Sequence, residues 1–474
     1  MTDSLELDEA TMRRLGHQVA DHVAGHLASL RQQRLFKSIP RREAQALIFT
    51  PPPIAGQDFD RLLEFLTARV FPHHTPEPHP GFLGYVQSCP TFPAVLGDWL
   101  AAGYNFFGGA WGVASGPAML EVTVLEWFRQ WTGMPEGTGG LLTSGGSTAN
   151  LMAIVAARHR SVGSDAERLP RSTLYASEQV HSSVFRAAWM AGIPRDNIRT
   201  IPVDSAYRMR IDLLEQALAA DLTNGLWPCA VVATAGTTNT GATDPLIQLS
   251  ELCHRRNIWL HVDAGYGGFA ALTPSGRAAL DGLGLADSVC LDPHKWLYVP
   301  FECGSLLARE PARLLEAFHI LPDYLRDLGA TGGEINFSDY GEQLSRYARA
   351  IKVWLCVSYF GTSRLADAIE ASIGRAELAE RLVRERAGLE VLSAARLGIC
   401  CFRAHPAGLD DPGRLDALNQ RVLERVNAGG RFFLSTTRLG GRLALRVCTC
   451  GWRTTSDDLV ALIDEVAAHA RSEG

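Results

Sequence analysis

Two short apolar segments, each followed by an ionisable residue, constrain the fold of this chain more than any other feature. Residues 257–260 lead into Asp263, and residues 287–291 lead into Lys295. Short apolar runs bounded by turn residues are typical of strands buried on both faces of a parallel sheet. The carboxyl ends of such strands share one edge of the sheet, and open α/β sheets bind ligands beyond that edge. We therefore expect Asp263 and Lys295 to lie close together in space.

An acid and a lysine at one crevice suit pyridoxal 5'-phosphate (PLP). A lysine holds this cofactor covalently, and an acid pairs with its pyridinium nitrogen. The same two residues would also suit a structural ion pair, because either charge alone is expensive to bury. Asp263 and Lys295 by themselves leave both interpretations open.

A turn rich in small residues supplies a candidate anion site. Residues 139–157 predict a short strand, a Gly/Ser/Thr turn and a strong helix. Backbone N–H groups at the start of a helix, together with hydroxyl groups, bind anions. Gly145, Gly146, Ser147 and Thr148 would therefore suit a phosphate. Their spacing matches neither the dinucleotide nor the P-loop motif, and Ser and Thr also cap helices without any ligand.

Strands alternate with helices along the middle of the chain. Residues 172–176 and 230–234 are apolar runs, and each precedes a segment with helical periodicity. This alternation predicts an α/β fold with a mostly parallel central sheet and helices on both faces. His181 and Thr238 follow the two runs and should lie at the same crevice. A single histidine is more often a hydrogen-bonded structural residue, so its position alone assigns it no role.

The chain is expected to have three parts. Residues 1–90 contain helical segments without a core of their own, which predicts a helical arm that packs on another subunit. Residues 91–365 would form the large ligand-binding domain. Residues 366–474 would form a small α/β domain that ends in a helix. Within the large domain, residues 319–345 lack periodicity and predict a mobile loop of the kind that closes over active sites.

Composition excludes several classes of function. The 474 residues carry a net charge of −6 with no long basic run, which argues against nucleic-acid binding. No segment approaches the roughly 18 consecutive apolar residues of a membrane helix, and the acidic N-terminus lacks the apolar region of a signal peptide. The ten cysteines are scattered without paired spacing. We therefore expect no metal site, no membrane association and a cytoplasmic location.

Three motifs carry a resemblance to one family. They are His-Ser-Ser-Val at 181–184, His-Val-Asp-Ala-x-Tyr at 261–266 and Asp-Pro-His-Lys-Trp at 292–296. From about residue 80 to residue 448 the chain resembles the PLP-dependent group II amino-acid decarboxylases, whose best-known members act on aromatic L-amino acids. The resemblance implies a fold type I architecture and a homodimer with shared active sites. It also implies decarboxylation of an amino acid to its amine and CO2.

The resemblance also implies roles for single residues. Lys295 would hold PLP, Asp263 would pair with the pyridinium nitrogen, and His181 would stack on the ring. The remaining implied contacts are Gly145, Gly146 and Ser147 at the phosphate, Thr238 and His294 beside the cofactor, and Tyr85, Val86, Phe107 and Arg446 at the substrate. Tyr324 matches the tyrosine of the family's mobile catalytic loop. It is a candidate proton donor, and His181 is the other.

Three positions depart from the family pattern. Glu77 stands where aromatic-specific members carry a tryptophan, and Gly109 lies near a position where they carry a phenylalanine. These changes predict a more polar or roomier substrate pocket. Asp292 replaces the asparagine of animal members, and a carboxylate beside a phosphate must turn away or find another partner.

Two other functions remain open at this point. A PLP enzyme of the same fold could form an aldehyde by oxidative deamination, or could carry out transamination. Tyr324 favours decarboxylation, because aldehyde-forming relatives typically carry phenylalanine there. A member without catalytic activity would be expected to lack Lys295, Asp263 or His181, and all three are present.

Overall fold

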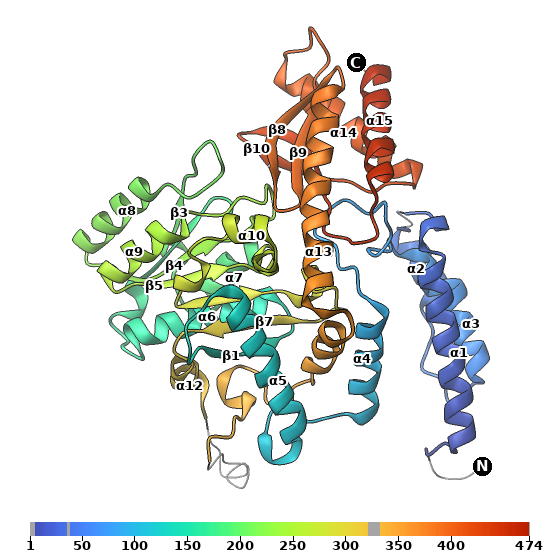
Figure 1. Cartoon of the computed structure of the whole chain (residues 1–474), viewed down its shortest axis with the longest axis horizontal. Coiled ribbons are helices and arrows are strands. Elements are labelled where there is room, and N and C mark those ends of the chain that lie inside the picture. Colours follow the sequence, from blue (N-terminus) through green and yellow to red (C-terminus); the bar gives the residue numbers. More distant parts are fainter. Residues whose placement is uncertain (1–4, 36–37, 321–331, 474) are drawn as a thin grey trace.

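A computed structural model of the chain describes residues 5–35, 38–320 and 332–473 (Figure 1). Its centre is a seven-stranded sheet with the order β1-β7-β6-β5-β4-β2-β3. The strands are β1 (Gly139–Thr143), β2 (Ser172–Ser177), β3 (Ile198–Ile201), β4 (Trp227–Thr234), β5 (Trp259–Asp263), β6 (Ser288–Leu291) and β7 (Gly304–Ala308). Only β7 runs against its neighbours, β1 and β6, and the other pairs are parallel. The predicted mostly parallel α/β sheet is confirmed.

Strand register brings the ends of the central strands into line. Asp263, the last residue of β5, pairs with Thr234 at the end of β4 and with Cys290 in β6. The segment that carries Lys295 leaves β6 immediately afterwards. Neighbouring parallel strands therefore deliver Asp263 and Lys295 to one edge, as their sequence positions predicted.

Alternate residues of the strands bury against helices on opposite faces. In β4, Ala230 and Val232 join a cluster with side chains of α7, whereas Val231 and Ala233 join the core that contains side chains of α8 and α9. This period of two is the signature of a strand covered on both sides. The helices of this domain are α4 (Phe92–Tyr104), α5 (Trp111–Thr132), α6 (Gly146–Val162), α7 (Ser182–Met190), α8 (Ile211–Thr223), α9 (Leu246–Arg256), α10 (Pro274–Ala279), α11 (Pro293–Trp296) and α12 (Ala312–Phe318).

A second, smaller sheet forms the C-terminal region. Its four strands have the order β10-β11-β9-β8, and all pairs are antiparallel. The elements are β8 (Leu389–Arg396), β9 (Ile399–Ala404), α14 (Pro412–Gly429), β10 (Ser435–Leu439), β11 (Arg442–Cys448) and α15 (Ser456–Glu473). The long helix α13 (Ala350–Glu385) runs from the large sheet to this region, with a non-helical residue at Gly361 (Figure 1). The expected boundary at residues 365/366 thus falls inside a helix.

The N-terminal helices lie along one side of the body, next to α4 (Figure 1). α1 (Glu9–Ala28), α2 (Arg41–Ile48) and α3 (Phe59–Phe65) contain no buried residue. The arm is anchored where Leu30 and Leu35 are buried and where Arg31 pairs with Asp458 at 2.8 Å. Within the described part of the arm, the buried apolar residues thus lie where it joins the body.

Three further expectations concern what the fold does not contain. Among the described residues, no helix is both long and apolar enough to cross a membrane. Within the same residues, no group of three or more histidine, cysteine or acidic side chains is arranged to hold a metal ion. All ten cysteines are buried free thiols.

Candidate active site

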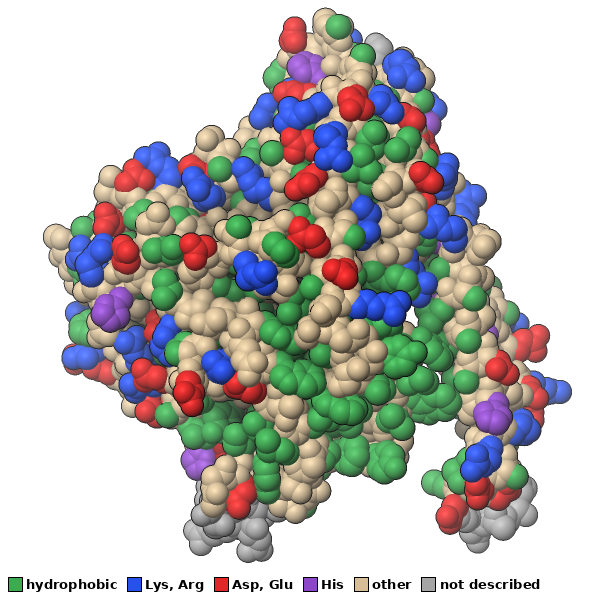
Figure 2. Space-filling model, in the orientation of Figure 1, with side chains coloured by type: hydrophobic (Ala, Val, Ile, Leu, Met, Phe, Trp, Pro, Cys, Tyr) green, Lys and Arg blue, Asp and Glu red, His purple; other side chains and the backbone are tan. Residues whose placement is uncertain are grey.

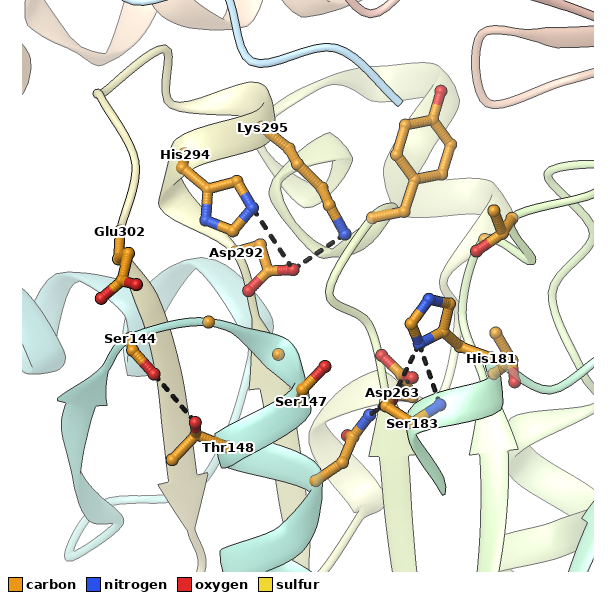
Figure 3. Close-up of a pocket in the computed structure, with 17 residues that line it drawn as sticks. Ser144, Ser147, Thr148, His181, Ser183, Asp263, Asp292, His294, Lys295 and Glu302 are labelled. Atoms are coloured by element: carbon orange, nitrogen blue, oxygen red, sulfur yellow. Dashed lines mark hydrogen bonds and ion pairs between the residues drawn. The ribbon is translucent and has the colours of Figure 1, made fainter. Parts of the chain in front are cut away.

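A cavity of about 320 Å³ lies at the carboxyl edge of the large sheet (Figure 3). It collects residues from six places in the sequence: the start of α6, the turns after β2 and β4, the segments after β5 and β6, and the segment before β7. The predicted residues that line it are Gly145, Gly146, Ser147, His181, Thr238, Asp263, His294 and Lys295. The structure therefore brings together the residues for which the sequence predicted a shared crevice.

The start of α6 forms one wall of the cavity. β1 ends at Thr143, and the helix begins two residues after Ser144, whose hydroxyl lies 2.8 Å from that of Thr148. A methyl group on Gly146 would lie 3.0 Å from Asp292 Oδ2 and 3.2 Å from Cys290 Sγ, so a larger residue would require these side chains to shift. The first N–H groups of the helix have no intrahelical acceptor and face an anion favourably.

Lys295 and Asp292 form an ion pair on the opposite wall. Lys295 lies on the single turn α11, and its Nζ is 2.8 Å from Asp292 Oδ2. Burial by itself would lower the pKa of Lys295, but the adjacent Asp292 carboxylate outweighs it and raises that pKa. Asp292 Oδ1 is buried without a hydrogen-bond partner. Asp292, which stands where animal members of the family carry asparagine, thus has Lys295 as its partner.

Asp263 is held by two donors on its protein side. The backbone N–H of Gly265 donates to Oδ1 at 3.1 Å, and Asn150 Nδ2 donates to Oδ2 at 2.9 Å. Sequence reasoning did not single out Asn150. A signal was present, because Asn150 lies four residues after Gly146 and therefore on the same face of α6.

His181 is the N-cap of α7 and is fixed through one ring nitrogen. The backbone N–H of Ser183 donates to His181 Nδ1 at 3.3 Å, and the Ser183 hydroxyl lies 2.8 Å from the same atom. His294 is held differently, since its Nδ1 donates to the Cys303 carbonyl at 2.6 Å. Burial lowers the pKa of His294 and favours the neutral imidazole.

The predicted substrate residues lie outside the walls of this cavity. Among the described lining residues, Tyr85, Val86, Phe107 and Arg446 do not appear. Tyr85 and Arg446 nevertheless meet, because the Arg446 guanidinium donates to the Tyr85 carbonyl oxygen. Arg446 is buried, and its Nε and Nη2 have no hydrogen-bond partner among the residues that the structure describes. Tyr324 falls outside the described residues.

Glu77 and Gly109, the two departures from the aromatic pattern, have structural partners. Glu77 Oε2 accepts the backbone N–H of Ser88 at 2.9 Å, and burial raises the pKa of this carboxyl. A methyl group on Gly109 would lie 2.3 Å from the Leu344 carbonyl oxygen. Glycine at 109 is therefore explained by a close backbone approach, and neither residue is among the described residues that line the cavity.

The cavity fits PLP in charge and in shape. It offers an amine at Lys295, a carboxylate at Asp263 and a helix start with no side chain at Gly146. These are the three partners that the aldehyde, the pyridinium nitrogen and the phosphate of PLP require.

Comparison with known proteins also indicates a PLP-dependent protein. The sequence model of the family described as "Pyridoxal-dependent decarboxylase conserved domain" matches residues 43–405. The aromatic-L-amino-acid decarboxylase of Bacillus atrophaeus is 35% identical over 99% of this chain and 98% of its own length. The phenylacetaldehyde synthase of Arabidopsis thaliana is 30% identical over 95% of this chain and 94% of its own length.

Comparison with a solved structure shows that the similarity includes the fold. The crystal structure of Oryza sativa TDC with PLP and tryptamine superposes with a TM-score of 0.94 at 28% identity, covering 99% of both chains. The similarity in sequence and in fold covers nearly the whole chain, and the cavity fits the cofactor of this family. The chain therefore belongs to the family of PLP-dependent decarboxylases.

Proposed function

We propose that this protein decarboxylates an aromatic L-amino acid to the corresponding amine and CO2. The observation that carries the proposal is the convergence of Lys295, Asp263 and the start of α6 on one cavity. The relatives named above as an aromatic-L-amino-acid decarboxylase and as TDC with bound tryptamine support an aromatic substrate.

Each cavity residue has a proposed task. PLP, when bound, supplies the electron sink that makes loss of CO2 from the substrate Cα accessible. Lys295 holds the cofactor, Asp263 keeps a carboxylate at its ring nitrogen, and His181 lies against the ring. Gly145, Gly146 and Ser147 bind the phosphate at the start of α6, where the helix dipole favours an anion. Thr238 and His294 complete the walls.

Arg446 is proposed to bind the substrate together with Tyr85, Val86 and Phe107. A buried guanidinium with two unpartnered nitrogen atoms lacks an anion. The α-carboxylate of an amino acid would supply that charge. The contact between Arg446 and the Tyr85 carbonyl would couple this anion site to the segment that carries Val86.

Proton delivery to Cα decides between the amine and a second candidate product. The 30% identical relative is a phenylacetaldehyde synthase, which supports aldehyde formation as the alternative. There the amine nitrogen leaves as ammonia, and dioxygen is reduced to hydrogen peroxide. Tyr324 is the proposed proton donor, and His181 is the other candidate. Transamination is the remaining alternative for this fold.

The experiment is to incubate the PLP-loaded protein with single L-amino acids and to measure amine, CO2, aldehyde and peroxide. Amine and CO2 in equal amounts without peroxide support decarboxylation. Tyr324→Phe should retain PLP but lose about 10²- to 10⁴-fold in amine formation, the contribution of a positioned general acid. Aldehyde and peroxide as main products of the unmodified protein would contradict the proposal.

We also propose a homodimer with shared active sites in the cytoplasm. The arm (residues 1–90) would cover the partner's large domain (91–365), with the small domain (366–474) outside this contact. Exposed apolar residues on α4 and α5, including Trp99, Leu100 and Tyr104, support this arrangement. Figure 2 shows hydrophobic side chains gathered on the side of the body that faces the arm. Ten free thiols agree with a reducing compartment.

A further inference from the structure

A chain of buried hydrogen bonds leads from Asp263 into the interior of the large domain. Asn150 Nδ2 donates to Asp263 Oδ2 at 2.9 Å, and Asn150 Oδ1 lies 2.8 Å from His261 Nε2. His261 Nδ1 lies 2.8 Å from Ser288 Oγ, which accepts the indole N–H of Trp259 at 2.8 Å. All five side chains are buried. The polar groups of these side chains must therefore find their hydrogen-bond partners among one another and not in solvent.

Two end groups, the Asp263 carboxylate and the Trp259 indole N–H, determine which atom donates in every hydrogen bond of this network. The Asp263 carboxylate can only accept, so Asn150 must turn its amide nitrogen toward it. The amide oxygen then faces His261 Nε2, which must carry the hydrogen. Burial lowers the pKa of His261 to about 4, so the ring is neutral at physiological pH and Nδ1 is an acceptor. Ser288 supplies the matching hydroxyl hydrogen, because its oxygen already accepts from Trp259, which can only donate.

A branch of the same chain reaches His181. The second hydrogen of Asn150 Nδ2 goes to Ser183 Oγ at 3.0 Å. The backbone N–H of Ser183 is an obligatory donor to His181 Nδ1, and the Ser183 hydroxyl donates to that atom as well. His181 Nδ1 therefore carries no hydrogen. The neutral ring holds its hydrogen on Nε2, the nitrogen that does not bond to Ser183.

We infer that Asn150 is a positioning residue, held in its donating orientation by His261, that fixes both Asp263 and the Nε2–H form of His181. This inference deepens the proposed function. Asp263 and His181 both line the cavity, where Asp263 would face the ring nitrogen of bound PLP and His181 would offer a donor at Nε2. A structural role alone would require only that the buried amide be satisfied. The positioning role requires in addition that losing its orientation changes PLP binding and not merely stability.

The first test compares two matched asparagines. Asn150→Leu keeps the size of the side chain and removes both donors. Asn419→Leu makes the same change at a fully buried asparagine of α14, whose amide bonds to the backbone of Ala404. PLP affinity, measured by titrating cofactor-free protein, should fall about 10- to 100-fold in Asn150→Leu, the range for a lost hydrogen bond to a charged group. Asn419→Leu should bind PLP as the unmodified protein does. Equal affinities in the two variants would overturn the inference.

The second test isolates His261. Gln at 261 can place a donor where His261 Nε2 stands, whereas Asn at 261 reaches only the Ser288 side. His261→Gln should retain PLP affinity, and His261→Asn should lose about tenfold or more. Identical PLP affinities in the two His261 variants would show that His261 does not hold Asn150 in its orientation.

The third test needs no substitution, so it still tests the hydrogen positions that the inference requires if Asn150→Leu fails to fold, and the His261 variants then test PLP binding. Long-range ¹⁵N–¹H spectra of histidine-labelled full-length protein report which ring nitrogen carries hydrogen. His261 and His181 should both show a bare Nδ1, and His261 should stay neutral from about pH 5.5 to about pH 8. A hydrogen on Nδ1 of either ring would overturn the inference. These spectra and the PLP titrations involve no amino-acid substrate. A protein that passes them but forms no amine would contradict only the proposed function.

Discussion

At the scale of single residues, Asp292 forms an ion pair with Lys295, the residue that we propose holds PLP. Lys295 must lose a proton before its amine can react, and Asp292 at 2.8 Å opposes that loss by raising the pKa of Lys295. Burial acts in the opposite direction and would lower this pKa if the carboxylate were absent. We therefore expect the charge at 292 to lower the fraction of neutral, reactive lysine near neutral pH.

Asp292→Asn should accelerate PLP capture. Without the carboxylate, the pKa of Lys295 falls, and each unit of fall makes the neutral amine about tenfold more abundant at a pH below the pKa. The measurement is the rate at which visible absorbance appears after cofactor-free protein is mixed with PLP at several pH values. Asp98→Asn is the control, since Asp98 pairs with Lys352 at 3.1 Å outside the cavity. Lys295→Ala should develop no such absorbance. An unchanged pH profile in Asp292→Asn would show that the ion pair does not limit capture.

His261 should make the stability of the protein depend on pH. Its pKa is lowered by burial to about 4 in the folded state, against an ordinary value of 6.5. The unfolded chain therefore binds the proton first as pH falls. Stability from this group is fully present above about pH 6.5 and is lost as pH falls toward 4, with an upper limit of about 3 kcal/mol.

Urea unfolding of the unmodified protein and of His261→Gln at pH values between about 7 and 4 measures this effect. The free energy of unfolding of the unmodified protein should fall more steeply than that of the variant. Parallel curves would mean that His261 is not held neutral by the fold.

At the scale of elements, the start of α6 shows how one glycine joins three segments. Gly146 lies against Cys290, which is part of β6, and against Asp292, which directly follows β6. Glycine at the start of a helix costs backbone entropy, so its presence here needs a packing reason. The close approach of the ion-pair carboxylate provides that reason.

Gly146→Ala should weaken PLP binding by displacing Asp292, and should lower the free energy of unfolding by about 1–3 kcal/mol, as overpacking does. Gly374→Ala is the matched control, because Gly374 lies inside α13 with open space around it. This control should raise stability by about 0.4–1 kcal/mol and leave PLP affinity unchanged. PLP titration and urea unfolding test both changes. Equal effects in the two variants would show that the contact at Gly146 is not tight.

At the scale of the whole molecule, the N-terminal arm is anchored to its own chain near Leu30 and Leu35 but leaves much of its apolar surface exposed. Its helices contain no buried residue, while Met12, Val19, Leu62 and Leu66 remain exposed. Contiguous exposed apolar surface marks an interaction site. A second copy of the chain is the partner that the proposed function requires.

Trp99→Glu should therefore convert a dimer to monomers or to an aggregated form. A charge at the centre of an apolar interface cannot be paired or solvated, so association weakens. Sedimentation velocity measures the change. Leu285→Glu is the control, because Leu285 is similarly exposed but lies beside α9, on the side of the body away from the arm (Figure 1). A Trp99→Glu protein that sediments as the unmodified one does would place the interface elsewhere.

Some elements were not predictable from the sequence for identifiable reasons. β8 is half-exposed along almost its whole length, so no period of two marks it as a strand. Leu397 and Gly398, which separate β8 from β9, have positive φ values of 41° and 78° and form a turn that hydrophobic periodicity does not reveal. The expectation of a mostly parallel sheet did not say which strand would run the other way, since the direction of β7 depends on how the chain returns and not on strand composition.

The sequence by itself determined that Asp263, Lys295, His181 and the start of α6 share one edge of a parallel sheet. Each follows a short apolar run, and parallel strands end at a common edge whatever their separation along the chain. Only the tertiary structure decided what these residues contact there. Asp292 faces Lys295, and Asn150 lies between Asp263 and His261, because segments far apart in sequence approach to within hydrogen-bond distance. Periodicity records which face of an element is buried, but not which polar atom of another element meets it.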